Sequence, residues 1–394
     1  MKRTSVSRLL SAALATSLLA GCQHPGLIQA TPQRMTAAAP DSGFQIQAAR
    51  ASRPPRPDFS RLSLLLELHV ENALLPTDQE TDYVIQLAQA ARAAGVTLSI
   101  GLGVDFLRSY NAGATVHAPL NGDFTLSSLV ALLQTTYGHT VNLHADVPES
   151  ASYAEIIHYL PPYVRELNDA GAQGSVASGA CNEAGADGGW VKGALDSGVT
   201  TIAGVVEDCQ ASLSATDYPT LWLDPAIVTP SRFHHPAPYE NPRQRAQGWF
   251  TNNVSTWISP YTPDSTETLN TSLFIVGSMG EAHPACLAET AAGTSCSDQA
   301  SAEQGTADAN ALLADLVQVV DLDRSGTSGD AYHAAFSTNI IVSATWINAY
   351  FSTLAAGIRN GSTPAGTTLA SAVQYSTLGA VAEANRQELR ASLP

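Results

Sequence analysis

Three ionisable side chains stand at alternating positions near the end of one apolar segment. Glu67, His69 and Glu71 are two residues apart in the sequence Leu-Glu-Leu-His-Val-Glu, so a β-strand would place all three on one face. A buried charge costs on the order of several kcal/mol unless it is paired or bound to a metal. The segment therefore predicts a functional site at the carboxyl end of a strand, where α/β barrels hold their active sites.

A second segment repeats this arrangement further along the chain. His144 and Asp146 are also two residues apart, at the end of the predicted strand Thr140–Ala145. Two imidazoles and one or two carboxylates from neighbouring strands suit Zn²⁺ or a similar divalent ion with an open coordination position. Such an ion would activate water as a nucleophile near neutral pH. The alternative interpretation is a polar core in which a carboxylate satisfies each histidine.

Further ionisable residues follow other predicted strands and are candidates for a general acid, a general base or a ligand. They are Asp105, Glu207, Asp208 and Asp224, with Glu281 and His283 as a weaker ligand pair. Taken singly, such residues are more often caps of loops and turns.

A calcium-binding loop is a weaker prediction. Asp321 and Asp323 match the first and third positions of such a loop, but the twelfth position is Tyr332 instead of a bidentate Glu. A solvated turn is the simpler interpretation.

From Arg61 onward, short apolar runs alternate with helical patterns, which is typical of βαβ units and a parallel sheet. The predicted strands are Leu62–Val70, Thr97–Val104, Thr140–Ala145, Gly174–Ser178, Thr200–Val206, Thr220–Leu223 and Leu273–Val276, then Asn339–Val342 and Ser371–Gln374. The predicted helices are Thr81–Ala94, Thr125–Thr136, Tyr153–Ala170, Gly188–Ser197, Ala307–Val320, Trp346–Ile358 and one from Leu378. This order predicts an α/β fold, a (β/α) barrel, with a long loop-rich insertion at about 225–270.

The amino-terminal 21 residues have the pattern of an export signal. A basic start precedes an apolar stretch from Leu9 to Ala20 and small residues before Cys22. The ending Leu-Ala-Gly-Cys resembles the lipobox of bacterial lipoproteins, which implies a lipid on Cys22, and Gln23 resembles the outer-membrane sorting pattern. An ordinary cleaved signal followed by a chance cysteine is the alternative. The apolar stretch is shorter than the roughly 20 residues that span a bilayer.

The predicted organisation therefore has three parts. Residues 1–21 are the signal, and residues 22–60, rich in Pro, Ala, Gln and Ser, are a disordered tether. Residues 61–394 are a barrel domain that we expect at the outer membrane or cell surface, or on the periplasmic side, held to the membrane only by the lipid.

Four further cysteines, Cys181, Cys209, Cys286 and Cys296, predict two disulfides in an oxidising compartment. Proximity favours Cys181 with Cys209 and Cys286 with Cys296, although three pairings exist. A four-cysteine zinc site is less favoured because no Cys-x-x-Cys spacing occurs.

Composition excludes several classes of protein. The 394 residues are 44% hydrophobic and 14% charged, which is too apolar for a disordered chain. Nineteen basic and thirty-five acidic residues give a formal net charge of -16. Such a surface repels phosphate backbones, so nucleic acid is not an expected partner, and a cationic or neutral ligand is favoured.

The order of these pieces resembles the polysaccharide deacetylase (NodB-like) family. The stretches that carry it are residues 63–106 with LLLELHVEN and AAGVTLSIGLGVDF, 138–173 with GHTVNLHADVPES, and 178–206 with SGACNEAGADGGW. The resemblance implies a distorted (β/α) barrel and a divalent metal that serves the removal of acetyl groups from amino sugars. By position, His144 matches the first histidine of the family's metal motif and Pro148 stands at the second. His69 and Glu71 lie nearest to the family's acidic pair.

Three hypotheses follow. The first is a metal-dependent hydrolase at the cell envelope that removes N- or O-acetyl groups from a polysaccharide. Its assigned ligands are His69, His144 and Asp146, and its candidate catalytic carboxylates are Glu71 as ligand or general base, Asp146, and Glu67 as the group that orients a histidine. The second is a non-catalytic carbohydrate-binding or envelope-assembly lipoprotein without the metal. The third is a metal-independent glycoside hydrolase that uses two carboxylates such as Glu71 and Glu207.

Overall fold

The structure is a computed structural model of the chain, which divides into two units, residues 1–48 and 49–394. Within the second unit it describes residues 60–71, 75–147, 152–180, 189–203, 248–252, 262–276, 280–282, 301–321, 331–338 and 341–393. None of the described helices is both long and apolar enough to cross a membrane.

Several features predicted from the sequence fall on residues that the structure does not describe. Outside the described residues lie the export signal, Cys22, the tether up to residue 59, the strand Thr220–Leu223, the cysteines Cys181, Cys209, Cys286 and Cys296, and the candidates Glu207, Asp208, Asp224, His283 and Asp323. The backbones of Asp146, Glu281 and Asp321 are described, but their side chains are not. These predictions stay predictions.

In the described part of the chain, ten strands form one sheet in the order β10-β11-β1-β2-β5-β6-β7-β9-β8, with β12 beside the start of β1. All neighbours are parallel except β8, which runs antiparallel to β9. The strands are β1 Leu62–Val70, β2 Leu98–Gly103, β5 Thr140–Val147, β6 Gln173–Ala180, β7 Thr201–Ala203, β8 Trp249–Thr251, β9 Leu273–Val276, β10 Gly280–Glu281, β11 Ala331–Ser337 and β12 Val373–Tyr375, with a separate hairpin of β3 Val116–Ala118 and β4 Gly122–Phe124. The fold is therefore mixed α/β with a mostly parallel central sheet, and its closure into a barrel stays a prediction.

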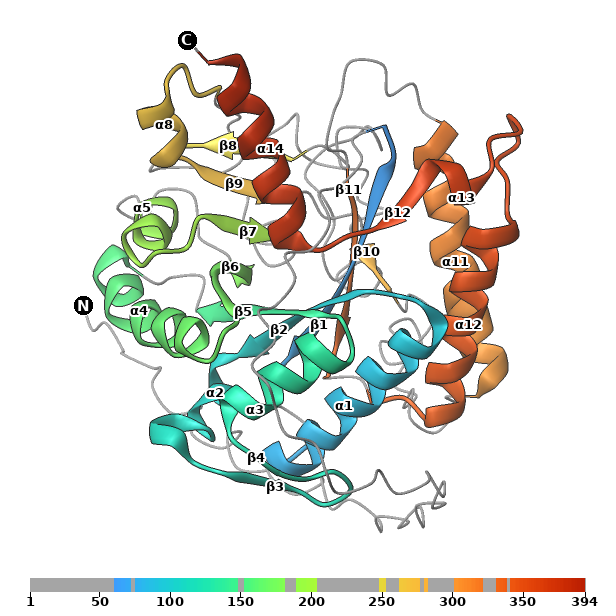
Figure 1. The fold of residues 1–394 in the computed structure, drawn as a ribbon, viewed down its shortest axis with the longest axis horizontal. Coiled ribbons are helices and arrows are strands. Elements are labelled where there is room, and N and C mark those ends of the chain that lie inside the picture. The colour runs from blue at the N-terminus through green and yellow to red at the C-terminus, as the bar shows by residue number, and fades with distance from the viewer. Residues whose placement is uncertain are drawn as a thin grey trace, which may run out of the picture. The chain divides into compact units, whose positions relative to one another are not determined.

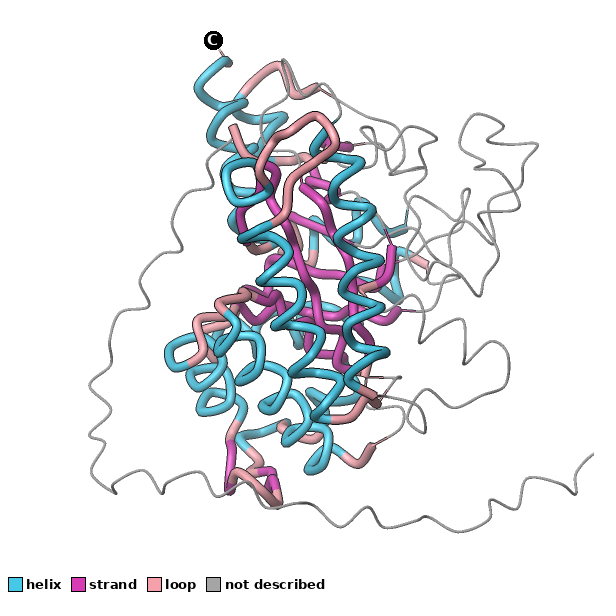
Figure 2. The backbone as a smooth tube through the Cα atoms, turned by 90° about the vertical axis from the view of Figure 1, so that its right-hand side faces the viewer, coloured by secondary structure: helices cyan, strands magenta, loops and turns pink. Residues whose placement is uncertain are grey.

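Helices connect these strands and cover the sheet (Figure 1). They are α1 Thr77–Ala94, α2 Val104–Arg108, α3 Leu126–Ala131 with a π-helical turn to Thr136, α4 Tyr153–Asp169, α5 Gly189–Asp196, α8 Thr266–Asn270, α11 Ala302–Asp321, α12 Ala344–Asn360, α13 Leu369–Ala372 and α14 Leu378–Ser392. The long helices α11 and α12 lie side by side against the strands (Figures 1 and 2).

β1 is buried on both faces, as a central strand of a parallel sheet should be. Its even-numbered positions point into the larger apolar core, and these are Leu62, Leu64, Leu66, Leu68 and Val70. On the opposite face, Leu65 packs in a second apolar cluster with Leu378 and Val381 of α14. Glu67 and His69 continue this second face toward the carboxyl end of the strand. The fold thus puts two ionisable groups where water is excluded.

The alternation of residues predicts most of these elements, and β1 and β9 have the predicted bounds. The strand expected at Asn339–Val342 does not form at Ile341 and Val342, the two of its residues that the structure describes. The strand in that region is β11, and Ile341 and Val342 precede α12 outside any strand. The reason is that the backbone N–H of Val342 donates to the hydroxyl oxygen of Tyr83 at 3.1 Å instead of to a neighbouring strand.

Arg386 joins α14 to the neighbouring backbone. Its largely buried guanidinium donates hydrogen bonds to the carbonyl oxygens of Leu269 at 3.0 Å, Thr200 at 2.6 Å and Ser272 at 2.9 Å. Burial lowers the pKa of Arg386 to about 10, so the group is still charged at neutral pH. We expect Arg386→Met to lower the free energy of unfolding by about 3 kcal/mol, because three carbonyl groups lose a charged donor. Urea denaturation measures the change.

The matched control is Arg390→Met, which removes an exposed arginine from the same helix. We expect that control to change the free energy of unfolding by less than about 0.5 kcal/mol. Equal losses of unfolding free energy in Arg386→Met and Arg390→Met would contradict the role given to Arg386.

His139 is a buried histidine that joins α1 to β2. Its Nε2 lies 2.8 Å from the carbonyl oxygen of Ala88, and its Nδ1 accepts from the backbone N–H of Leu98 at 3.2 Å. Burial lowers the pKa of His139 below its usual value of 6.5. The unfolded chain therefore binds the proton first, and the stability that neutral His139 provides is lost as pH falls below about 6.5.

We accordingly expect the difference in unfolding free energy between the wild type and His139→Gln to shrink between pH 7.5 and pH 5.5. Urea denaturation at both pH values tests this, and a constant difference would contradict it.

Candidate metal centre

β1 brings three ionisable side chains to its carboxyl end. Glu67 and His69 are fully buried on one face of the strand, and Glu71 directly follows it with 12% of its side chain exposed. The backbone N–H of Glu71 donates to Thr338 Oγ1 at 2.9 Å, and this hydroxyl donates to Glu80 Oε1 at 2.5 Å. These bonds fix the backbone from which the Glu71 side chain projects.

β2 lies between β1 and β5 and carries a glycine opposite each of the two histidines. Gly101 pairs with His69, and Gly103 pairs with His144 on β5. Because glycine has no side chain, the two imidazole rings can stack across β2, and their centroids are 4.2 Å apart. A Cβ atom on Gly101 would lie 3.2 Å from Glu67 Oε1 and 3.3 Å from the His144 Cβ. The glycines of β2 thus provide the space in which the site forms.

Glu71 faces both histidines. Its Oε1 lies 3.7 Å from His144 Nε2 and 3.9 Å from His69 Nδ1, and one ligand atom from each of the three residues lies within 4.8 Å of the others. Both distances exceed those of hydrogen bonds. Ligand atoms that lie about 2.0–2.2 Å from a tetrahedral zinc ion are themselves about 3.4 Å apart. This buried group could therefore hold a metal ion.

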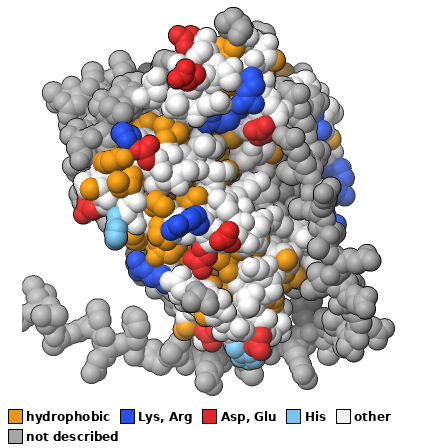
Figure 3. All heavy atoms as spheres, turned by 60° about the vertical axis from the view of Figure 1, so that its left-hand side comes forward, with side chains coloured by type: hydrophobic (Ala, Val, Ile, Leu, Met, Phe, Trp, Pro, Cys, Tyr) orange, Lys and Arg blue, Asp and Glu red, His pale blue; other side chains and the backbone are white. Residues whose placement is uncertain are grey.

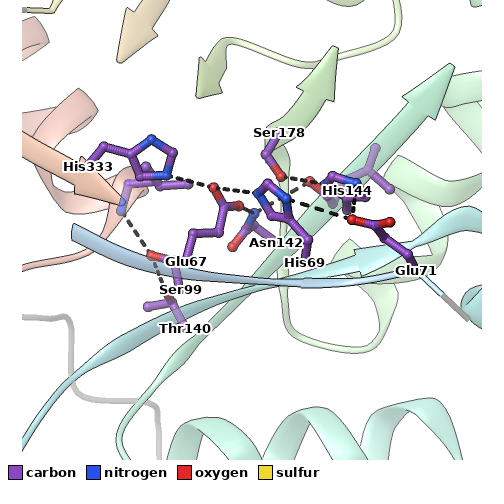
Figure 4. Close-up of polar contacts among 11 residues, drawn as sticks. Glu67, His69, Glu71, Ser99, Thr140, Asn142, His144, Ser178 and His333 are labelled. Carbon is purple, nitrogen blue, oxygen red and sulfur yellow. Dashed lines mark hydrogen bonds and ion pairs between the residues drawn. The ribbon is translucent and has the colours of Figure 1, made fainter. Parts of the chain in front are cut away.

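The nitrogen of each histidine that is turned away from Glu71 has its own partner (Figure 4). His144 Nδ1 lies 3.0 Å from the hydroxyl oxygen of Ser178 on β6, and His69 Nε2 lies 3.3 Å from Glu67 Oε2. Metal-binding histidines characteristically present one nitrogen to the ion while a carboxylate, carbonyl or hydroxyl group orients the other. The donor set and its outer partners fit a divalent ion.

Glu67 is the centre of a buried hydrogen-bond network. It accepts from His333 Nε2 on β11 and from Asn142 Nδ2 on β5, both at 3.0 Å. Burial raises the pKa of the Glu67 carboxyl, but the two imidazoles beside it, His69 and His333, outweigh burial and hold the pKa well below its usual range. Glu67 is therefore ionised in the folded protein.

Ser178 is a positioning group and not a nucleophile. Its hydroxyl contacts His144, as a nucleophilic serine would contact its base. However, Ser178 is completely buried on β6, so a substrate cannot reach its oxygen. Solvent reaches the site at Glu71, where 12% of the side chain is exposed, and at His144, where 4% is exposed.

Two of the predicted site residues, Asp146 and Asp105, are not among the side chains that the structure brings together at the histidines. Asp146 lies on β5 two residues beyond His144, and its side chain is outside the described part. Asp105 was expected on the same rim, but it lies in α2, is exposed and pairs with Arg108, so the structure does not bring it into the site. Acidic and basic side chains also lie close together elsewhere on the face that Figure 3 shows.

Sequence reasoning missed Asn142, Ser178 and His333 as members of the site. Asn142 stands two residues before His144, so the alternation that places His144 on the inner face also places Asn142 there. The segment around His333 gives no comparable signal. Its sequence, Ala-Tyr-His-Ala-Ala-Phe, is rich in alanine, and because alanine is depleted in strands the segment does not stand out as one.

No protein-family model matches the chain, and the search among curated proteins finds no match.

Proposed function

We propose that the protein is a zinc-dependent hydrolase that removes N- or O-acetyl groups from a polysaccharide of the cell envelope. The observation that carries this proposal is the buried group His69, Glu71 and His144, in which each histidine is oriented at its other nitrogen. Two histidines and one carboxylate are the protein ligands of hydrolytic zinc sites that keep a position open. Resemblance of the sequence to polysaccharide deacetylases supports the substrate and a distorted barrel.

The roles of the side chains follow from their exposure and contacts. When bound, a divalent ion supplies a Lewis acid that polarises a carbonyl oxygen and lowers the pKa of water. His69, His144 and Glu71 would hold it. Glu71 is the carboxylate ligand of this group and the most exposed of its three members. Glu67 is fully buried, so its role is to orient His69.

The net charge and the predicted lipid anchor support the same proposal. Deacetylation of an amino sugar leaves an amine, and a chain with a net charge of -16 would attract the resulting cationic glycan. A lipid on Cys22 would hold the domain at the envelope, where such polymers lie.

Acetate release tests the proposed activity. We expect the full-length protein, loaded with Zn²⁺, to release acetate from N-acetylated amino-sugar oligomers or O-acetylated glycans. A chelator should abolish the release and added Zn²⁺ should restore it. Chelator-resistant formation of reducing ends would instead favour a glycoside hydrolase. Zn²⁺ binding without acetate release from any of these polymers would contradict the deacetylase proposal and favour a carbohydrate-binding role.

A further inference from the structure

β11 lies beside β1 although the two strands are far apart in the sequence. His333, on β11, is fully buried, and its Nε2 lies 3.0 Å from Glu67 Oε2. The same carboxylate oxygen lies 3.3 Å from His69 Nε2. Three buried side chains therefore stand in the order His333, Glu67, His69, and they end at the candidate metal ligand (Figure 4).

The contacts of His333 define its role as a donor. Its Nδ1 is buried and has no hydrogen-bond partner among the described residues, whereas its Nε2 lies 3.0 Å from the Glu67 carboxyl oxygen Oε2. The proton of a neutral imidazole therefore lies on Nε2, where it is donated to Glu67.

Glu67 is held from both sides of the site. Asn142 on β5 donates to Oε1, and His333 on β11 donates to Oε2. The carboxylate therefore cannot rotate away from His69 without breaking a buried hydrogen bond. A carboxylate in this position selects the His69 tautomer that carries its proton on Nε2, which leaves Nδ1 turned toward Glu71 and His144 as a ligand.

We propose that His333, acting through Glu67, is a positioning residue that orients His69 for metal binding. This inference rests on the proposed function, because it requires that a metal binds His69. The inference adds His333 to the site. This residue lies 266 positions from Glu67 in the sequence, supplies no ligand and does not touch the substrate.

Two variants of His333 separate the effect of its hydrogen bond to Glu67 from the effect of its packing. His333→Gln keeps an N–H donor at about the same reach, and His333→Met fills similar space without a donor. The dissociation constant of Zn²⁺ is measured by competition with a chromophoric chelator, and the absorption spectrum of bound Co²⁺ reports ligand geometry. We expect His333→Met to raise the dissociation constant by about 10- to 100-fold and to change the Co²⁺ spectrum. We expect His333→Gln to stay within about threefold of the wild type.

His139→Met is the matched control for the loss of a buried histidine. The His139 imidazole has hydrogen bonds to the backbone groups of Ala88 and Leu98, and neither residue belongs to the site. We expect this variant to be less stable but to bind Zn²⁺ as the wild type does. A comparable loss of affinity in His139→Met and His333→Met would overturn the proposal.

Glu67→Gln keeps the test decisive if His333→Met does not fold. It preserves the shape of the side chain but removes the charge that faces both histidines, and we expect a similar loss of Zn²⁺ affinity. Unchanged affinity in Glu67→Gln, or equal affinities in the wild type and both His333 variants, would overturn the positioning role alone. A folded wild type that binds no Zn²⁺ would overturn both this role and the proposed function.

Discussion

Glu71→Gln is expected to weaken Zn²⁺ binding by more than about 100-fold and to abolish acetate release. The Glu71 Oε1 atom is the one that faces both imidazoles, at 3.7 Å and 3.9 Å, so the substitution removes a charged ligand from the centre of the group. Loss of an outer partner of a metal ligand costs about 10- to 100-fold in affinity, and loss of a ligand should cost more. Titration with Zn²⁺ against a competing chelator measures the effect.

Asp105→Asn is the control for this prediction. Asp105 is an exposed carboxylate that pairs with Arg108 away from the histidines. Its substitution should leave both Zn²⁺ affinity and acetate release unchanged. Zn²⁺ binding by Glu71→Gln with the affinity of the wild type would contradict the assignment of Glu71 as a ligand.

Gly179→Ala is expected to damage the site through His144. Gly179 has a φ of +65°, and a Cβ atom there would lie 2.4 Å from Cε1 and 2.8 Å from Nδ1 of the His144 ring. The imidazole would have to move away from the Ser178 hydroxyl. We expect Zn²⁺ affinity to fall by about 10-fold or more, by the reasoning that applies to lost outer partners. We also expect the free energy of unfolding to fall by about 2–4 kcal/mol, from backbone strain and overpacking together.

Gly171→Ala is the control that separates the effect of backbone strain from the effect of overpacking against His144. Gly171 also has a positive φ, +86°, but a Cβ atom there would have no neighbour within 4 Å. This control should show only the backbone strain, about 1–2 kcal/mol, and normal Zn²⁺ binding. If Gly179→Ala bound Zn²⁺ as well as Gly171→Ala does, the contact with His144 would have no role in the site.

The three residues of the candidate metal centre, His69, Glu71 and His144, could be predicted as site residues from the sequence. The alternation of polar and apolar residues in β1 places Glu67, His69 and Glu71 on one face, and the same alternation places His144 on the inner face of β5. Parallel strands end at the same edge of a sheet, so the two segments were expected to meet there.

Two supporting residues, His333 and Gly101, could not be predicted, because their roles depend on tertiary structure. His333 contacts Glu67 only because β11 pairs with β1, and neither the strand character nor this long-range pairing is evident in an alanine-rich segment. The role of Gly101 is also invisible locally, since it depends on lying between two strands that carry histidine.

The central claim is that His69 and His144 bind one metal ion together. The most direct test is the metal content of the full-length protein, purified without chelator and supplied with Zn²⁺, beside His69→Ala and His144→Ala. The account predicts about one ion per chain in the wild type and its loss in both variants. A folded wild type that takes up no Zn²⁺, or variants that each retain a full equivalent, would contradict it.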